Sequence, residues 1–174
     1  MSSPLTPDAL CRLLDERGIR YARTEHVAVF TVAESAALRG TLPGLHTKNL
    51  FLKDKKGRYF LVSAREDARI DLKRLHGVIG ASGRLSFGSA EQLMDLLGVA
   101  PGSVTALAVV NDPERRVSFV LDRRLATGEA VNFHPLVNTA TLTLPFPDLL
   151  AFLESTGHPP LIVDLPVEGD GQGE

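Results

Sequence analysis

The chain contains a series of short apolar runs separated by polar or glycine-containing turns, and this pattern limits its possible folds more than any other feature. The runs at 48–52 and 58–63 flank a polar turn, which predicts a β-hairpin. Further strands are expected at 21–26, 84–87, 105–110, 117–121, 130–133, 139–144 and 161–165. Strands outnumber helices and several are joined by short turns, so the sheet must be mixed or mainly antiparallel. The sequence therefore predicts an α+β fold.

Helix signals lie between these runs. Thr6 is expected to cap a helix that has Pro7 at its first position and ends at Gly18. Residues 31–34 have capping-box spacing, which predicts a short helix ending near Gly40. Further helices are expected at 72–78, 89–97 and 147–155. With 174 residues and no linker, the chain is expected to form one domain over residues 1–166, followed by a polar, disordered tail at 167–174.

Cysteine and histidine usage argues against several kinds of site. Cys11 is the only cysteine, so an intramolecular disulfide and a cysteine-based zinc cluster are impossible, and its leucine neighbours indicate a core residue rather than a nucleophile. The five histidines lack the i, i+4 spacing of a helical metal site, and neither a P-loop nor a Gly-x-Ser-x-Gly elbow occurs. We expect neither a metal nor a cofactor.

Hydropathy and the N-terminal residues bear on location. No apolar stretch approaches the roughly 18 residues of a membrane span, and the first residues lack the pattern of a signal peptide. We therefore expect a soluble, cytoplasmic protein with no membrane contact, either a monomer or a homodimer.

Charge is unevenly distributed along the chain. The net charge is −2, but residues 48–74 carry nine basic and four acidic side chains, so this segment is +5 and the remainder is −7. A local basic surface on an acidic body suits a partner that presents a few phosphates at one place. The alternative is a solvated, salt-bridged surface.

Three polar clusters lie at the boundaries of expected elements. The first is 47–49, where Lys48 is either a fixed cation at the mouth of a cleft or an edge-strand lysine that blocks aggregation. The second is 98–103, whose glycines and proline either direct backbone N–H groups at an oxyanion or simply stop a helix. The third is 132–135 with 138–140, where Pro135 holds His134 extended, so that His134 is either a cleft residue or a satisfied core or surface histidine.

These clusters, in this order, resemble the YbaK/prolyl-tRNA-synthetase-associated family of editing domains. The resemblance is carried by residues 47–54 (TKNLFLKD), 98–105 (GVAPGSVT), and 132–135 (NFHP) with 138–141 (NTAT), and it extends over about residues 5–165. The versions of the first two motifs are most similar to the freestanding branch that deacylates Ala-tRNA(Pro), called PrdX or ProX. The resemblance implies a barrel-like sheet flanked by helices.

The resemblance also implies site residues. It makes Lys48 the essential lysine and places the loop of Gly98, Pro101 and Gly102 against the substrate ester. The implied aminoacyl-pocket residues are Thr47, Asn49, Ser103, Phe133 and His134. The residues expected to contact tRNA phosphates are Lys53, Lys55, Lys56 and Arg58. The implied partners are the acceptor end of an aminoacyl-tRNA and prolyl-tRNA synthetase.

The expected function is hydrolysis of mischarged tRNA, with Ala-tRNA(Pro) as the substrate and water as the nucleophile. A synthetase for proline cannot exclude the smaller alanine by size, because each missing methylene is worth only about 1–3 kcal/mol. A second, smaller pocket can admit alanine and refuse proline. The alternatives are a deacylase for another mischarged tRNA, such as Cys-tRNA(Pro), and a non-catalytic tRNA-binding module.

Overall fold

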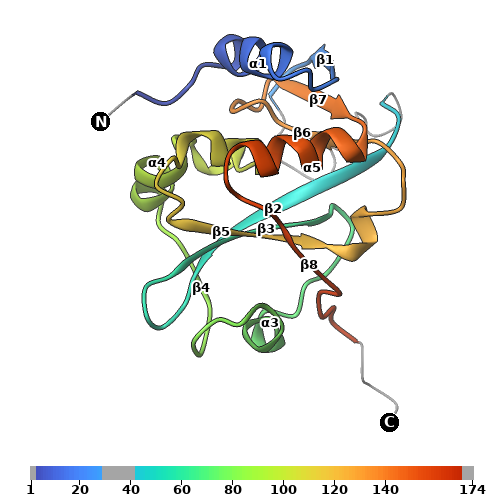
Figure 1. Cartoon of the computed structure of the whole chain (residues 1–174). Helices are drawn as coiled ribbons and strands as arrows, with labels where there is room; N and C mark the ends of the chain where they lie inside the picture. Colours follow the sequence, from blue (N-terminus) through green and yellow to red (C-terminus); the bar gives the residue numbers. More distant parts are fainter. Residues whose placement is uncertain (1–2, 29–41, 170–174) are drawn as a thin grey trace.

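The expected strands and helices form a mixed sheet with helices on both faces in a computed structural model that describes residues 3–28 and 42–169 (Figure 1). The α-helices are α1 (Pro7–Glu16), α3 (Leu72–Ile79), α4 (Ala90–Leu97) and α5 (Phe146–Ser155). The strands are β1 (Ala22–Glu25), β2 (Leu45–Lys53), β3 (Tyr59–Arg65), β4 (Ser86–Phe87), β5 (Val117–Asp122), β6 (Val131–Phe133), β7 (Ala140–Leu144) and β8 (Leu161–Val163). The 3₁₀ segments are η1 (Pro101–Ser103), η2 (Ala106–Asn111) and η3 (Arg123–Leu125).

Local side-chain chemistry begins two of the helices as expected. The Thr6 hydroxyl accepts a hydrogen bond from the Ala9 N–H at the start of α1. At α4, Ser89 and Gln92 form a full capping box, in which each side chain accepts from the backbone N–H of the other. Such caps satisfy N–H groups that have no partner within the helix.

The strands follow the order β1-β7-β6-β2-β3-β5-β8, and β4 also pairs with β2. The pairs β1–β7, β6–β7, β2–β3 and β2–β4 are antiparallel, whereas β2–β6, β3–β5 and β5–β8 are parallel. In Figure 1, β1, β7 and β6 stand above β2, β3 and β5, so the sheet turns around the main core. The α+β prediction with a mixed sheet and flanking helices is confirmed.

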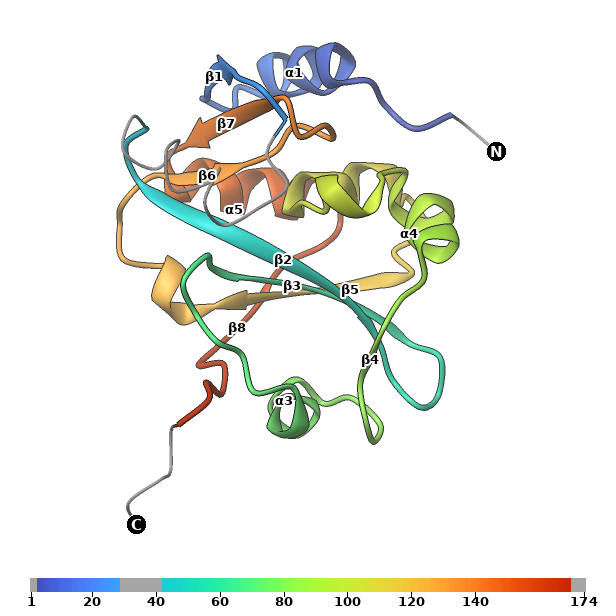
Figure 2. The same cartoon turned by 180° about the vertical axis from the view of Figure 1, so that it is seen from behind.

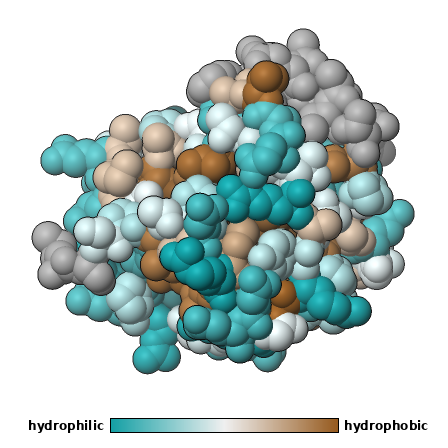
Figure 3. Space-filling view, turned by 90° about the horizontal axis from the view of Figure 1, so that it is seen from above, coloured by the Kyte–Doolittle hydropathy of each residue, from teal (hydrophilic) through white to brown (hydrophobic). Residues whose placement is uncertain are grey.

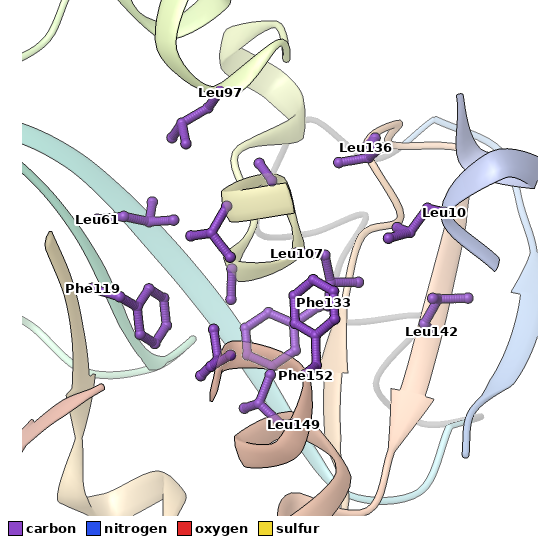
Figure 4. Close-up of a cluster of buried hydrophobic side chains, with 14 of the residues drawn as sticks. Leu10, Leu61, Leu97, Leu107, Phe119, Phe133, Leu136, Leu142, Leu149 and Phe152 are labelled. Atoms are coloured by element: carbon purple, nitrogen blue, oxygen red, sulfur yellow. The ribbon is translucent and has the colours of Figure 1, made fainter. Parts of the chain in front are cut away.

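The sheet separates two hydrophobic cores. In the main core, Leu61 and Phe119 from the sheet face Leu107, Phe133 and Phe152 (Figure 4). The second core lies under α3, on the other face of β2 and β3, and Leu52, Val62 and Leu75 belong to it. Figure 2 shows α3 alone on that side, opposite α4 and α5. The two faces of β2 therefore belong to different environments.

Cys11 belongs to the main core and is 8% exposed, which confirms that it is a core residue. The face seen from above is mixed, with hydrophobic areas broken up by hydrophilic side chains (Figure 3). Among residues 3–28 and 42–169, no helix has the length and apolarity needed to cross a membrane.

The structure corrects two local expectations, and a third lies outside the described residues. The strand expected at 105–110 was wrong, because Ala106–Asn111 forms the 3₁₀ segment η2, whose first turn is capped by the Thr105 hydroxyl. The helix expected after residues 31–34 lies outside the described residues. The tail expected from residue 167 was wrong at its start, because Val167 pairs with Ile70 and the Glu168 N–H donates to the carbonyl of Arg69.

Candidate active site

The start of β2 is fixed beside β6 by a close backbone approach. Gly44 has a φ of 88°, and a Cβ there would lie 2.4 Å from the carbonyl oxygen of Ala130. The same carbonyl accepts a hydrogen bond of 2.8 Å from the Leu45 N–H. Glycine is required where backbones approach this closely. The contact starts the parallel pairing in which His46 is the partner of Asn132.

This pairing brings two of the predicted clusters together. Directly paired residues share a sheet face, and so do residues two apart on one strand. Lys48 lies two residues after His46 on β2, and His134 follows the end of β6, two residues after Asn132. The charges of His46 and Glu66 both act on His134, which agrees with a position of His134 on the face of His46 and Lys48. This is the face whose continuation along β2 and β3 is covered by α3.

Asn132 joins the strands at this junction. Its Nδ2 donates to the carbonyl oxygens of Pro43 (2.8 Å) and Leu45 (3.2 Å), and its Oδ1 accepts from the Thr143 hydroxyl at 2.6 Å. The Thr47 hydroxyl donates to the Asn132 carbonyl at 2.7 Å. Asn132 and Thr47 therefore hold the strands that carry Lys48 and His134, and Thr47 has a positioning role.

Lys48 is half-buried, and its Nζ donates a hydrogen bond to the carbonyl oxygen of Ala68. Burial lowers the pKa of its ammonium group, because desolvation penalises the charged form. The carboxylates of Asp67, Glu168 and Glu66 oppose that shift. The site thus holds a cation that is partly removed from water and supported by nearby acids.

His134 has a defined tautomer. Its Nδ1 lies 3.0 Å from the carbonyl oxygen of Ala140, so Nδ1 carries the proton and donates it. Burial is the largest cause that lowers the pKa of His134, and His26 and His46 lower it further, whereas the bond to the Ala140 carbonyl and the carboxylate of Glu66 oppose the shift. At neutral pH the ring is therefore uncharged, and its Nε2 lone pair is available to accept a hydrogen bond.

His26 is a site residue that the sequence did not single out. Its ring centroid is 6.1 Å from that of His134. Its Nδ1 donates to the Val27 carbonyl at 2.7 Å, and its Nε2 accepts from the Thr141 hydroxyl at 2.8 Å. The sequence did place His26 at the end of an expected strand. It did not show that this strand pairs with β7, and this pairing is what brings His26 beside Thr141.

Asn49 lies on the opposite face of β2 from Lys48, because successive side chains alternate. Its Oδ1 accepts a short hydrogen bond from the Ser63 hydroxyl. It also lines a pocket of about 210 Å³ with Phe51, Pro101 and Val104. Asn49 therefore lies with Pro101 of the glycine loop and not on the face of Lys48, and its contact with substrate stays a prediction.

The glycine loop also lies across the strand from Lys48. A Cβ at Gly98 would lie 2.6 Å from Pro4 and 2.9 Å from Asn111, so this residue packs against the N-terminal segment. The Gly98 N–H donates to the carbonyl of Met94, and the Ser103 N–H to that of Ala100. These two N–H groups are already used, and Pro101 has none. The expectation that Gly98, Pro101, Gly102 and Ser103 face the ester at Lys48 is not supported by this geometry.

Phe133 and the hairpin cations lie away from Lys48 and His134. Phe133 is 2% exposed and belongs to the main core, and its contact with substrate stays a prediction. Lys53 follows Lys48 by five residues on an extended strand, which places it about 16 Å away. The hairpin tip beyond it carries Lys55, Lys56 and Arg58, and Arg58 is paired with Asp54 at 2.9 Å. Phosphate contacts by these cations remain a prediction.

Comparison with known proteins supplies the family. The model of the aminoacyl-tRNA editing domain matches residues 26–152, which include every predicted site residue. The chain belongs to this family. Editing an aminoacyl-tRNA means hydrolysing its ester bond, so the chain is an aminoacyl-tRNA deacylase, as the sequence predicted.

Relatives of this editing domain extend over most of the chain. The zebrafish (Danio rerio) "Prolyl-tRNA synthetase associated domain-containing protein 1" is 45% identical over 141 residues, covering 80% of this chain and 76% of the relative. The "Prolyl-tRNA editing protein ProX" of Acetoanaerobium sticklandii is 37% identical over 151 residues, covering 86% and 92%. The crystal structure of a proposed trans-editing enzyme for prolyl tRNA synthetase has a TM-score of 0.67 and 24% identity, covering 93% of this chain and 98% of that one. That structural likeness confirms the fold.

Proposed function

We propose that this editing domain is a freestanding hydrolase that removes alanine from Ala-tRNA(Pro). The observation that carries the proposal is the shared sheet face of Lys48 and His134, at a junction built by Gly44 and Asn132. The names of the zebrafish and Acetoanaerobium relatives support a prolyl-tRNA context. Alanine is the amino acid that a proline pocket cannot exclude by size, so it is the substrate for which a smaller second pocket is needed.

In the proposed reaction, a water oxygen attacks the ester carbonyl carbon and the bond from that carbon to the ribose oxygen breaks. The proton lost by water passes to the leaving ribose oxygen, with the neighbouring ribose hydroxyl as relay. The Lys48 ammonium stabilises the oxyanion or anchors the ribose-phosphate end. A preformed cation acts most strongly where water is partly excluded, as it is around Lys48.

His134 supplies an acceptor for the amino acid. Its neutral ring points Nδ1 at Ala140, which leaves Nε2 to accept a hydrogen bond from the substrate's ammonium group or from the attacking water. The imidazole is also a rigid wall that limits the size of the side chain admitted. We propose this wall and acceptor role rather than that of an obligatory general base, because the substrate's own hydroxyl serves the proton transfer.

We further propose that the reaction takes place in the cytoplasm, on product released by prolyl-tRNA synthetase. The substrate then reaches the site through its acceptor end, with the basic residues at 53–58 as phosphate contacts. These residues carry four positive charges on a single hairpin of a chain whose net charge is negative.

A deacylation panel tests the proposal. The purified chain is incubated with Ala-tRNA(Pro), Cys-tRNA(Pro) and Pro-tRNA(Pro), and loss of each ester is measured above the rate in buffer. We expect rapid loss of alanine, little loss of proline, and no gain over buffer with a Lys48→Ala variant. Faster loss of cysteine than of alanine would reassign the substrate, and no loss of any ester would refute the function.

A further inference from the structure

A second polar cleft lies at the edge of β5, away from Lys48 and His134. Strand β8 pairs only with Val120–Asp122, so within the described chain the first half of β5 has no neighbouring strand on that side. A cleft of about 380 Å³ occupies this position between the end of α3 and the connection from α5 to β8. We call it the Arg58–Arg115 cleft. Its polar lining comes from Arg58, Arg115, Ser118 and His158, and its apolar lining includes Phe60 and Leu161.

The backbone conformation of Arg115 and a close contact at Gly157 hold the Arg115 side chain in this cleft. Arg115 itself has a φ of 57°, in the left-handed region that non-glycine residues seldom adopt. Its side chain passes over Gly157, where a Cβ would lie 2.7 Å from the Arg115 Cδ. The turn that begins at Asp112 accounts for the left-handed conformation, because the Arg115 N–H donates to the Asp112 carbonyl at 3.1 Å. Within the described chain, the Arg115 guanidinium has no hydrogen bond or ion pair that would use its donors.

The cleft is electropositive. Arg58 is fixed by Asp54 at 2.9 Å and by the Gly80 carbonyl at 2.9 Å, and its guanidinium keeps further N–H groups. None of the lining residues, all of them in the described part of the chain, is acidic. Two buried carboxylates lie close to the lining residues, and both are already hydrogen-bonded. Asp54 accepts from Arg58 and from the backbone N–H groups of residues 56, 58 and 82. Asp112 accepts from the backbone N–H groups of residues 116 and 117 and contacts His158 at 2.9 Å. Two arginines and no free carboxylate favour an anion.

The cleft opens at the edge of β5. It shares Phe60 and Val120 with the sheet face of the active site, whereas its residues Val117 and Phe119 belong to the main core. Lys48 pairs with Ala64, and Phe60 lies four residues earlier on β3, or about 13 Å along the strand. Successive phosphates on one strand of a duplex are spaced by about 3.4 Å along its axis. A nucleic acid whose 3′ end is at Lys48 can therefore place a backbone phosphate several nucleotides from that end in the cleft.

We propose that the Arg58–Arg115 cleft binds a backbone phosphate of the tRNA acceptor stem and measures the distance from the esterified end to the stem. The inference rests on the proposed function, since it takes the ester to lie at Lys48. Arginine is suited to this contact because its fork of N–H donors matches phosphate oxygens. The contact is to backbone, so it sets register on the tRNA without reading sequence.

The test compares Arg115→Ala with Arg116→Ala. Arg116 is the adjacent residue, carries the same charge, and points to Asp95 instead of the cleft. For Arg115→Ala we expect an increase of about tenfold in KM on Ala-tRNA(Pro) and unchanged rates on an alanylated CCA trinucleotide, which lacks the stem. The affinity for uncharged tRNA(Pro) is then measured at several salt concentrations. In the Arg115→Ala variant, the slope of log affinity against log salt concentration should fall by the amount that one phosphate contact contributes. Arg116→Ala should resemble the wild type in each assay.

A second variant separates the guanidinium from the backbone. Arg115→Gly relieves the left-handed strain, whereas Arg115→Ala keeps it, so equal losses in both variants identify the side chain as the cause. Wild-type affinity and salt slope in the Arg115 variants would overturn the proposal, as would equal losses in Arg116→Ala. If the wild type deacylates nothing, the proposed function fails, but binding of uncharged tRNA still decides whether the cleft holds a phosphate.

Discussion

Replacing Lys48 with alanine removes a cation that the active-site face holds partly out of water. The side chain is fixed by the Ala68 carbonyl, and its lowered pKa reflects the desolvation that the folded state tolerates. A charge that is already desolvated needs no reorganisation when negative charge develops on the substrate. Its removal should therefore affect the transition state far more than the fold.

The expected magnitude follows from these contacts. Loss of one preorganised oxyanion donor raises the activation barrier by about 2.7–4 kcal/mol in enclosed sites. Lys48 is only half-buried, so we expect at least about 2 kcal/mol, which is roughly a 30-fold loss in kcat/KM. The variant also loses the hydrogen bond from Lys48 to Ala68, which contributes about 1 kcal/mol to the free energy of unfolding. It no longer has to desolvate the ammonium group, and this gain offsets part of the loss. A change in Tm of no more than about 2–4 °C is expected for a chain of this size.

The assay is single-turnover deacylation of Ala-tRNA(Pro) by the wild type, Lys48→Ala and Lys73→Ala. Lys73 is an exposed lysine of the same basic segment, so its variant changes net charge equally without touching the site. Thermal unfolding of all three variants accompanies the kinetics. Wild-type deacylation by Lys48→Ala, or an equal loss in Lys73→Ala, would refute the role assigned to the Lys48 ammonium.

Four further results are expected. His134→Ala should reduce hydrolysis of Ala-tRNA(Pro) and admit larger groups, which a panel of alanyl, seryl and prolyl esters measures; a uniform loss with an abolished pH dependence would favour a general base. Because burial lowers the pKa of His134, the unfolded chain binds the proton first, so stability should fall below about pH 6.5, and urea unfolding of His134→Gln should show a smaller fall. Cys11→Ser should keep deacylation and lose some stability, by thermal unfolding, because a hydroxyl enters the core. Charge reversal at Lys55 and Lys56 should weaken tRNA binding and its salt dependence, whereas an unchanged affinity would move the phosphate contacts elsewhere.

Local chemistry made much of the fold predictable. The polar turn at 54–57 predicted the β2–β3 hairpin, and the caps at Thr6 and Ser89 predicted where two helices begin. The failure at 105–110 has a physical reason. Ala106, Leu107, Ala108 and Val109 are all buried, so no alternation of polar and apolar residues distinguishes a strand from a tight helical turn.

The site was only partly predictable, because it depends on which strands become neighbours. Lys48 and His134 were chosen from motifs, and the β2–β6 pairing places them on one face. The same alternation shows that the adjacent residue Asn49 must face the other way, and this was available from the strand period alone. The hydrogen bond between His26 and Thr141 could not be predicted from the sequence, because it depends on the register in which β1 pairs with β7.

The short β2–β6 pairing explains why the site can exist without a large loss of stability. Only Leu45 and His46 pair with β6, while β2 continues to Lys53 beside β3. Where two strands part, backbone groups lose their partners, and an unsatisfied buried group costs about 1–3 kcal/mol. Side chains supply such partners at this junction. The Thr47 hydroxyl, just beyond the last strand pair, donates to the Asn132 carbonyl, and the Asn132 amide donates to the carbonyls of Pro43 and Leu45 on the incoming chain. The strands can therefore separate beyond this point and leave polar side chains between them, which is the condition for a catalytic cleft in an otherwise continuous sheet.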